Sequence, residues 1–278
     1  MTVARAELIA QLLQRALRVG DEAGELLTTQ RPAQLQVHSK SGATDIVTDM
    51  DQRSEALIVE RLTAGRPGDG VLAEEGSAHQ PDSGIRWVID PIDGTVNYLY
   101  GIPVWAVCIG VELDGEPVAG VVAVPELREM YYAAIDTGAW LRTPVQTRRI
   151  HVGSVTDLSM ALVATGFGYS VQRRTKQADT VAALLPKVRD IRRAGTASVD
   201  ICWLASARVD GYYEVGLKPW DHTAACVVAR EAGAIMTGPP GEQPSDRLVM
   251  GANPGLYPSL LGVLQAAQAW TGPGVDAP

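Results

Sequence analysis

With 278 residues, 46% of them hydrophobic, the chain is long and apolar enough to bury a substantial core, which excludes a mainly disordered protein. Its formal net charge of −8 argues against a nucleic-acid-binding protein, because the arginine pairs are isolated rather than gathered into a basic stripe. An acidic protein that acted on anionic substrates would need cations, and divalent metal ions are the obvious supply.

The cysteines and the apolar runs predict a soluble, cytoplasmic protein with no membrane partner. Cys108, Cys202 and Cys226 are odd in number, widely spaced and set among apolar residues, which favours reduced core thiols over disulfides or a zinc site. The longest apolar run, 102–111, is too short to span a bilayer, and the N-terminal residues lack the apolar core of a signal peptide.

The first part of the chain predicts two helices around a polar loop. Apolar residues recur at helical spacing from Ile9 to Leu27, which predicts a long amphipathic helix that ends near Pro32. The loop that follows contains Lys40, and a second helix is expected over 49–62.

Strands follow the second helix. The first of them leads into the acidic pair Glu74-Glu75. Asp114-Gly115 is a strong hairpin signal between two later strands, so we expect an antiparallel meander. Strands are expected over 70–73, 86–89, 103–113, 117–125 and 128–135.

Beyond about Ile150 the pattern changes to alternating short strands and helices, which places a lobe boundary there. We therefore expect an N-terminal α+β lobe over 1–150, a C-terminal α/β lobe over 151–270 and a disordered tail over 271–278. In the second lobe, strands are expected over 160–165, 190–193, 211–214 and 248–251, and helices over 176–185, 196–207, 219–232 and 257–269.

The most informative stretch is 87–95, with the sequence WVIDPIDGT. Because it begins as a buried strand and a proline biases Asp90 toward extended backbone, the carboxylates of Asp90 and Asp93 are expected to converge across a tight turn. Gly94 lets the backbone approach a ligand closely, and Thr95 is a good N-cap residue whose following turn presents free N–H groups to a phosphate. Metal and phosphate would meet in one loop. The alternative is an Asp-rich turn that satisfies its own backbone.

Acidic residues gather at the ends of three predicted elements. Glu74-Glu75 and the pair Asp90 and Asp93 follow strands, and Asp221 lies in the first turn of a helix. Mg²⁺ prefers oxygen ligands and usually takes only one or two carboxylates, so converging acids would suit two ions that share Asp90. For Asp221 alone, the helix macrodipole is a sufficient explanation.

Several motifs occur in a fixed order along the chain: Thr48-x-x-Asp51, Glu74-Glu75, Asp90-Pro91-Ile92-Asp93-Gly94-Thr95 with Asn97, Gly195-Thr196-Ala197 with Asp200, and Tyr213-Glu214 followed by Gly216-Leu217-Lys218-Pro219-Trp220-Asp221. On these motifs the chain resembles the inositol monophosphatase family, the magnesium-dependent, lithium-sensitive phosphatases of the sugar-phosphatase superfamily. The resemblance runs from the first helix to the last. It implies a layered αβαβα sandwich, a fold of the α+β or α/β class.

The resemblance implies a Mg²⁺ site built from the acidic motifs. Glu74, Asp90 and the backbone carbonyl of Ile92 would hold one ion. A second ion would bind to Asp90, Asp93 and Asp221. A weaker third ion would use Glu74, so two or three ions are implied.

The resemblance also implies how a phosphate ester would be hydrolysed. The first ion would lower the pKa of its bound water, and Thr95 paired with Asp51 would orient that water for in-line attack on phosphorus. Glu75 would lie near the attacking water. The second ion and the backbone amides of Gly94 and Thr95 would stabilise charge on the phosphate and the leaving group.

Residues of the second lobe would recognise the remainder of the substrate, where the family contacts inositol hydroxyls. Two structural explanations stay open: Thr196 as a helix N-cap and Glu214 as the partner of a cation. The substrate-binding residues would be Asp93, Gly195, Thr196, Ala197, Glu214 and Asp221.

Two further residues and one turn stand apart from this assignment. The resemblance puts Lys40 on a mobile lid, and a solvated loop lysine is the alternative. His222 occupies a position where an apolar residue is commoner in the family, and we expect it to be structural. The family's Asn-Gly turn is missing near 140–144, which puts the end of the meander in doubt.

The expected activity is hydrolysis of inositol 1-phosphate to myo-inositol and phosphate, carried out by a homodimer. A histidinol-phosphate phosphatase or a fructose-bisphosphatase is the nearest alternative, because these enzymes share the metal core. A catalytically silent partner-binding protein would have lost a metal ligand, and none is lost. A P-loop nucleotide enzyme would need Gly-x4-Gly-Lys-Ser/Thr, which does not occur.

Overall fold

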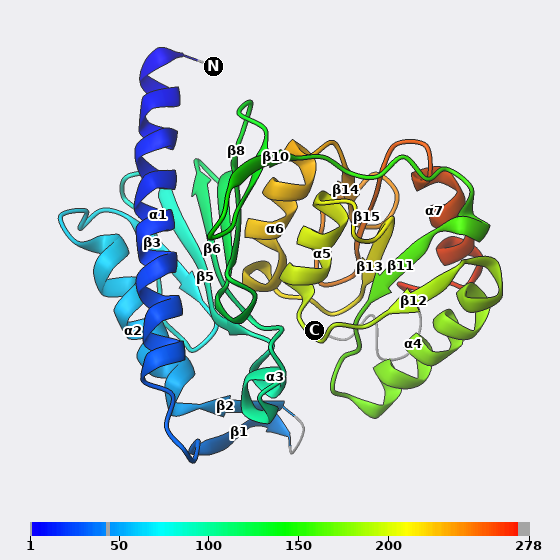
Figure 1. Ribbon diagram of the computed structural model, residues 1–278, viewed down its shortest axis with the longest axis horizontal. Coiled ribbons are helices and arrows are strands. Elements are labelled where there is room, and N and C mark those ends of the chain that lie inside the picture. The colour runs from blue at the N-terminus through cyan, green and yellow to red at the C-terminus, as the bar shows by residue number, and fades with distance from the viewer. Residues whose placement is uncertain (1, 43–44, 272–278) are drawn as a thin grey trace.

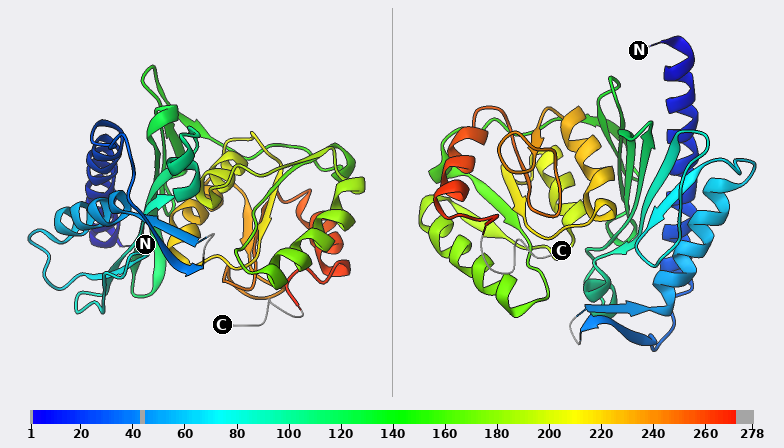
Figure 2. Two further views of the ribbon diagram at one scale, coloured as in Figure 1. Left: turned by 90° about the horizontal axis from the view of Figure 1, so that it is seen from below. Right: turned by 180° about the vertical axis from the view of Figure 1, so that it is seen from behind.

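The structure, a computed structural model, describes residues 2–42 and 45–271. Helices and sheets alternate in five layers, with two outer helix pairs, two sheets and a central helix pair between the sheets (Figures 1 and 2). The expected αβαβα sandwich is thereby confirmed. None of the helices in the described ranges is both long and apolar enough to cross a membrane.

Most helices begin and end within three residues of the predicted positions, but α4 begins five residues earlier than expected. The outer pairs are α1 with α2 and α4 with α7, the central pair is α5 with α6, and α3 is a short helix just beyond the end of β5. Their bounds are α1 Val3–Thr29, α2 Asp49–Thr63, α3 Thr95–Tyr100, α4 Val171–Leu184, α5 Ala197–Ala205, α6 Pro219–Glu231 and α7 Tyr257–Ala266.

The larger sheet has eight strands in the order β10-β9-β8-β7-β6-β5-β3-β4, and only β3 and β5 run parallel in it. The meander is confirmed, and Asp114 and Gly115 both adopt the positive φ that its β6–β7 hairpin needs. Its strands are β3 Gly70–Ala73, β4 Ala78–His79, β5 Ile85–Asp93, β6 Ala106–Leu113, β7 Glu116–Val124, β8 Glu129–Ala134, β9 Ala139–Arg142 and β10 Thr147–Ile150.

The smaller sheet has the order β12-β11-β13-β15-β14, in which β11 runs parallel to both of its neighbours. β14 was not expected from the sequence. The strands of this sheet are β11 Leu162–Thr165, β12 Asp190–Arg192, β13 Gly211–Glu214, β14 Ile235–Thr237 and β15 Val249–Ala252.

Three apolar clusters fill the spaces between the layers. The first lies under α1 and α2 and contains the predicted helical stripe from Ile9 to Leu27. The second joins the other face of the larger sheet to α5 and α6 and includes Cys108, Cys202 and Cys226, which are buried and not bonded in disulfides. The third lies between the smaller sheet and α4 and α7. The two sheets are therefore held together by one shared helix layer.

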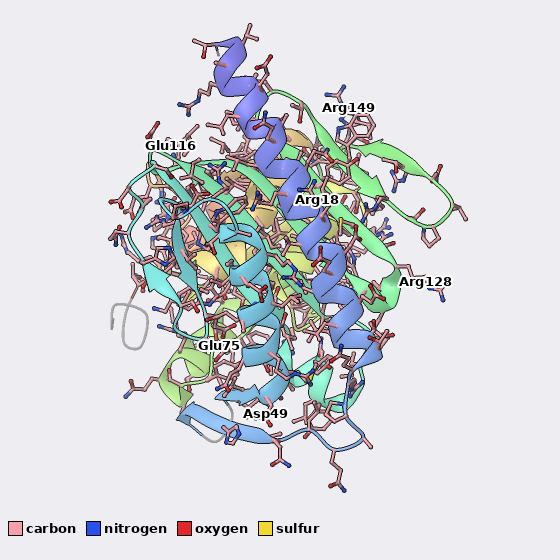
Figure 3. All side chains as sticks on the ribbon, turned by 90° about the vertical axis from the view of Figure 1, so that its left-hand side faces the viewer. Arg18, Asp49, Glu75, Glu116, Arg128 and Arg149 are labelled. Atoms are coloured by element: carbon pink, nitrogen blue, oxygen red, sulfur yellow. The ribbon has the colours of Figure 1, made fainter. Side chains whose placement is uncertain are left out.

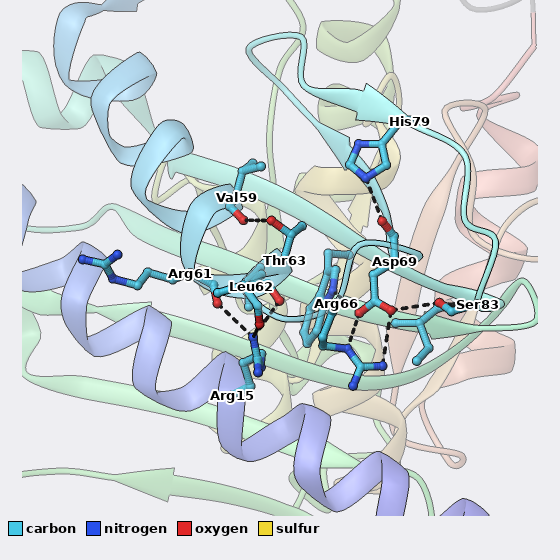
Figure 4. Close-up of polar contacts among 12 residues, drawn as sticks. Arg15, Val59, Arg61, Leu62, Thr63, Arg66, Asp69, His79 and Ser83 are labelled. Carbon is cyan, nitrogen blue, oxygen red and sulfur yellow. Dashed lines mark hydrogen bonds and ion pairs between the residues drawn. The ribbon is translucent and has the colours of Figure 1, made fainter.

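Polar contacts fix the outer helices and the approach to β3 (Figure 4). The guanidinium of Arg15 on α1 donates to the carbonyl oxygens of Leu62 and Ala64 at 3.0 and 2.8 Å, which satisfies the last turn of α2. The buried carboxylate of Asp69 accepts hydrogen bonds from Ser83 at 2.8 Å and from Trp87 at 3.0 Å. α1 and α2 thus lie side by side across the sheet, with Asp49 and Glu75 toward the same end (Figure 3).

Three expectations need correction. The predicted polar loop around Lys40 contains a hairpin of β1 (Val37–Gly42) and β2 (Asp45–Thr48), whose strands lack the alternation that marks a buried strand. The strand expected over 86–89 continues to Asp93, because β6 pairs with it across a bulge that absorbs Pro91. The meander also continues into β9 and β10 without an Asn-Gly turn. The lobe division at 150 stays a prediction, and 272–278 lies outside the described residues.

Candidate active site

A cavity of about 620 Å³ lies between the ends of β3 and β5 and the second half of the chain, where α5 and α6 begin and β13 ends. It is lined by most of the site residues predicted from the sequence. These are Glu74, Asp90, Ile92, Asp93, Gly94, Thr95, Gly195, Thr196, Ala197, Glu214 and Asp221.

Two predicted residues, Asp51 and Glu75, are not among those that line the cavity, and a third, Lys40, cannot be placed against it. Asp51 is fully buried behind it, and Glu75 is half-buried on the loop beside it. Lys40 lies within β1, and its side chain is outside the part of the chain that the structure describes.

The bulge in β5 brings two acids to the same wall. Asp90 and Asp93 are 2% and 9% exposed, and the Ile92 N–H donates to Asp90 Oδ1 at 3.0 Å. Burial, followed by the charges of Glu74, Asp93 and Asp221, raises the pKa of Asp90 well above its ordinary value. Like charges are therefore held together in a site that has little contact with water.

Asp221 reaches the same acids from the start of α6. Its Oδ2 accepts the Lys218 N–H at 2.7 Å, so it does cap its helix as the macrodipole argument allows. Burial, and next the charge of Glu74, raises the pKa of Asp221 well above its ordinary value. Among the described residues, no ion pair involves Asp90, Asp93 or Asp221.

Thr95 contacts the buried Asp51, as the motifs implied. Its Oγ lies 3.0 Å from Asp51 Oδ1 and 3.1 Å from the Ile92 carbonyl oxygen. Asp51 Oδ2 accepts hydrogen bonds from the Thr48 N–H at 2.7 Å and from the Thr48 hydroxyl, which form the capping box of α2. Burial raises the pKa of Asp51, and its hydrogen bonds to Thr48 oppose that shift.

Thr95 does not cap α3, which corrects one expectation. Gly94 is the N-cap residue, with φ of 93°, and Thr95 is the first residue of the helix. A side chain at Gly94 would approach Thr196 to 3.2 Å, so glycine is needed both for the backbone angle and for the close contact with the second half of the chain. The Thr95 hydroxyl is thereby left to bind Asp51.

Glu55 is a site residue that sequence reasoning missed. It is buried on α2, and its two carboxylate oxygens accept the N–H groups of Glu75 at 2.7 Å and Ser77 at 3.0 Å. These bonds fix the loop that presents Glu74. The sequence did contain a signal for Glu55, because Asp51 and Glu55 continue the buried stripe that Ile58 and Leu62 form on α2.

Ser198 and Asn97 were also missed as contacts between the two halves of the site. The Ser198 N–H donates to Asp93 Oδ2 at 2.8 Å, and its hydroxyl bonds to the same oxygen. Asn97 Nδ2 donates to the carbonyl oxygens of Val104 at 2.6 Å and Ala194 at 2.9 Å. A polar residue in the first turn of a helix was the only sequence signal for Ser198.

The structural alternative for Thr196 holds in part, because Thr196 is the N-cap residue of α5, although its side chain makes no capping hydrogen bond. Burial raises the pKa of the neighbouring Asp93, and hydrogen bonds from Ser198 and Thr196 oppose that shift. Glu214 forms no ion pair among the described residues, and its Oε2 accepts the Tyr212 hydroxyl at 2.8 Å. Burial raises the pKa of Glu214 to about 7.

His222 is not among the residues that line the cavity, and its structural role stays a prediction. It is buried on α6 with Nδ1 at 4.0 Å from Cys226 Sγ, and burial lowers its pKa to about 4. The imidazole is therefore neutral at physiological pH.

The donor set suits Mg²⁺. As the side chains stand, no group of three or more His, Cys, Asp or Glu within 2–42 and 45–271 encloses an ion position. Mg²⁺ needs only one or two carboxylates, with water and phosphate oxygens as its other ligands. Glu74, Asp90, Asp93 and Asp221 supply hard oxygen donors whose mutual repulsion a cation would relieve.

Known proteins are similar to this chain in sequence and fold. The chain is 44% identical over 235 residues to the inositol-1-monophosphatase of Mycobacterium bovis, covering 82% of the chain and 81% of the relative. It is 34% identical over 230 residues to the Nus factor SuhB of Escherichia coli K12, covering 81% of the chain and 84% of the relative.

Two solved structures match closely. Mycobacterium tuberculosis SuhB superposes with a TM-score of 0.80 at 38% identity, covering 94% of this chain and 98% of that one. The Thermotoga maritima IMPase gives a TM-score of 0.83 at 26% identity, covering 92% and 97%. Residues 9–270 match the sequence model of the inositol monophosphatase family. The chain belongs to that family.

Proposed function

We propose that the protein is a magnesium-dependent phosphatase that hydrolyses inositol 1-phosphate to myo-inositol and phosphate. Family membership supports a phosphatase of this superfamily. The observation that carries the proposal is the cavity in which Glu74, Asp90, Asp93 and Asp221 converge beside Thr95.

Glu74, Asp90, the Ile92 carbonyl, Asp93 and Asp221 would hold two or three Mg²⁺ ions. When bound, Mg²⁺ lowers the pKa of water and polarises phosphate oxygens. The neighbouring N–H groups of Gly94 and Thr95, at the turn where α3 starts, would donate to the phosphate.

Thr95 and Asp51 would orient the attacking water and remove its proton. Thr95 Oγ can donate its own hydrogen to Asp51 Oδ1, which leaves an oxygen lone pair to accept a proton from water. Thr48 keeps Asp51 fixed through the capping box. Proton transfer from water to Thr95 and from Thr95 to Asp51 would leave a hydroxide for in-line attack. Glu75 would lie near the attacking water, and Lys40 would lie on a lid over the site.

The second half of the chain would bind the inositol hydroxyls. Gly195, Thr196 and Ala197 lie at the start of α5, and Glu214 lies at the end of β13, all on the cavity wall. The buried Thr196 Oγ and the Glu214 carboxylate are hydrogen-bonding groups that a polyol ring can satisfy. Asp93 and Asp221 would contact the substrate from the metal side.

A sister activity on histidinol phosphate or fructose bisphosphate is the nearest rival, because only these second-half contacts would differ. A partner-binding role is a second rival, since one relative is named a Nus factor. The presence of all four proposed metal-binding acids, Glu74, Asp90, Asp93 and Asp221, on the cavity wall supports catalysis. A homodimer and a reducing, cytoplasmic location, which the free buried cysteines suit, remain predictions.

The test is a phosphate-release screen over inositol 1-phosphate, histidinol phosphate, fructose 1,6-bisphosphate and adenosine 3′,5′-bisphosphate, with and without Mg²⁺. We expect fastest turnover of inositol 1-phosphate, loss of activity after chelation, and inhibition by Li⁺. Undiminished turnover without metal would overturn the metal mechanism. Preference for another ester would overturn the substrate, and no turnover of any ester would favour the binding role.

A further inference from the structure

Asp200 lies on the cavity wall, in the first turn of α5, three residues beyond the Gly195-Thr196-Ala197 segment. Its side chain is 1% exposed. An acid in a first helical turn is ordinarily a solvated residue that complements the helix dipole. Burial of this carboxyl beside a cavity requires another explanation, because an ionisable group without full hydrogen bonding is costly to bury.

Only one of the two Asp200 carboxyl oxygens accepts a hydrogen bond from a described residue. Oδ2 accepts the Ala194 N–H at 3.3 Å, which fixes the turn before Gly195. Oδ1 has no hydrogen-bond partner among the described residues. A buried oxygen of this kind calls for a partner. The cavity is the open space beside Asp200 from which such a partner could come.

The surroundings of Asp200 fit a sugar-like hydroxyl. Burial, and next the charge of Glu214, raises the pKa of Asp200 to about 8, while Arg193 opposes the shift. One oxygen of Glu214 accepts the Tyr212 hydroxyl, and the carboxylate packs so closely on Gly166 that a side chain at position 166 would collide with it. Two neighbouring carboxyl groups on one wall can pair with hydroxyls in either protonation state, because a hydroxyl both donates and accepts.

We propose that Asp200 is a specificity-determining residue whose Oδ1 hydrogen-bonds to a hydroxyl of a polyol phosphate, beside the hydroxyl bound by Glu214. The inference deepens the proposed function and rests on it. It assigns Asp200 no part in the chemistry at phosphorus, which the proposal places at Glu74, Asp90, Asp93 and Asp221. Asp200 therefore distinguishes polyol phosphates from simple esters.

Three variants test this role. Asp200→Ala removes both hydrogen bonds. Asp200→Asn keeps an oxygen for the Ala194 N–H and places an amide toward the cavity. Asn97→Ala is the matched control, because Asn97 binds the carbonyl of the same Ala194 without supplying the unpartnered oxygen. It loosens the turn while leaving Asp200 in place.

The readout is the ratio of kcat/KM for myo-inositol 1-phosphate to kcat/KM for p-nitrophenyl phosphate, which has no hydroxyl. We expect Asp200→Ala to lower this ratio about tenfold, mainly through KM for the inositol ester, as loss of a hydrogen bond to a buried polar group predicts. Asp200→Asn should lower the ratio less than Asp200→Ala does. Asn97→Ala should slow both esters alike and leave the ratio unchanged.

An unchanged ratio in a folded Asp200→Ala protein overturns the inference. A ratio that falls equally in Asn97→Ala overturns it as well, because Asp200 would then act only through the turn. If the unmodified protein hydrolyses p-nitrophenyl phosphate but not the inositol ester, the proposed substrate fails separately. Calorimetric titration of myo-inositol 1-phosphate then decides the role of Asp200, and equal affinity for the unmodified protein and Asp200→Ala overturns it.

Discussion

At the scale of single residues, Asp93 connects the end of β5 to α5. Its Oδ2 accepts both the N–H and the hydroxyl of Ser198. In Asp93→Asn the amide oxygen can keep these bonds, so the NH₂ group would face the proposed Mg²⁺ position in place of a charged oxygen. We expect kcat to fall by about two orders of magnitude or more with the fold intact.

Steady-state phosphate release and circular dichroism measure the two effects of Asp93→Asn. Ser198→Ala serves as the control, because it removes only the hydroxyl bond and should lower activity far less. Near-normal turnover of Asp93→Asn would show that Asp93 does not ligate the ion.

A substitution at Glu214 tests substrate preference separately from metal binding. Glu214→Gln keeps an oxygen for the Tyr212 hydroxyl but removes the carboxylate proposed to bind a substrate hydroxyl. Turnover of myo-inositol 1-phosphate should weaken relative to glycerol 2-phosphate, by a factor that corresponds to about 1–3 kcal/mol. The dependence on Mg²⁺ should not change. We would compare kcat/KM for the two esters, and an unaltered ratio would make Glu214 structural.

At the scale of elements, β7 and α6 pack closely at Gly120. A Cβ at Gly120 would collide with the backbone carbonyl of Ala224, which cannot move without the helix. We expect Gly120→Ala to destabilise the protein by about 1–3 kcal/mol, as overpacking in a core does. Since α6 carries Asp221, activity should fall as well.

Gly262→Ala is the matched control for Gly120→Ala. Gly262 lies within α7 and has open space where a Cβ would stand, so alanine there should stabilise by up to about 1 kcal/mol. Urea denaturation compares the variants. Equal stability of Gly120→Ala and the unmodified protein would show that α6 can shift away from the sheet.

Elements with strong periodicity were predictable from the sequence. The stripe from Ile9 to Leu27 and the Asp114-Gly115 turn depend on local rules, and the structure confirms both. The β1–β2 hairpin and the extension of β5 to Asp93 were not predictable, because pairing with a neighbouring strand decides them.

The candidate site divides in the same way. Most of the motif acids line the cavity, because Glu74, Asp93, Glu214 and Asp221 lie at or next to the ends of elements. Glu55, Ser198 and Asp200 were not assigned roles, since their importance depends on contacts between segments far apart in the sequence. Of these three residues, only Glu55 could have been found from the sequence, because it is a carboxylate on the buried stripe of a predicted helix.

At the scale of the whole molecule, acids from both halves of the chain meet in one cavity, which makes stability depend on pH and metal. Burial raises the pKa of Asp200 to about 8 and of Glu214 to about 7. In the metal-free protein the folded state therefore keeps protons that the unfolded state has already released. Stability should fall as the pH rises from about 6.5 to about 8.5. His222 does not contribute in this range, because its lowered pKa affects stability only at more acidic pH.

Mg²⁺ should oppose that loss of stability. Glu74, Asp90 and Asp93 come from the first half of the chain and Asp221 from the second, so an ion bound between them stabilises only the folded arrangement. We expect Mg²⁺ to raise the thermal midpoint more at about pH 8.5 than at about pH 6.5, because ionised acids bind it better. Asp200→Asn should flatten the pH dependence of the chelated protein and leave the Mg²⁺ effect in place, whereas Asp93→Asn should reduce the Mg²⁺ effect. Calorimetric scans in EDTA and in Mg²⁺ measure both. A midpoint that Mg²⁺ does not change at either pH would mean that the acids do not form a metal site in the folded protein.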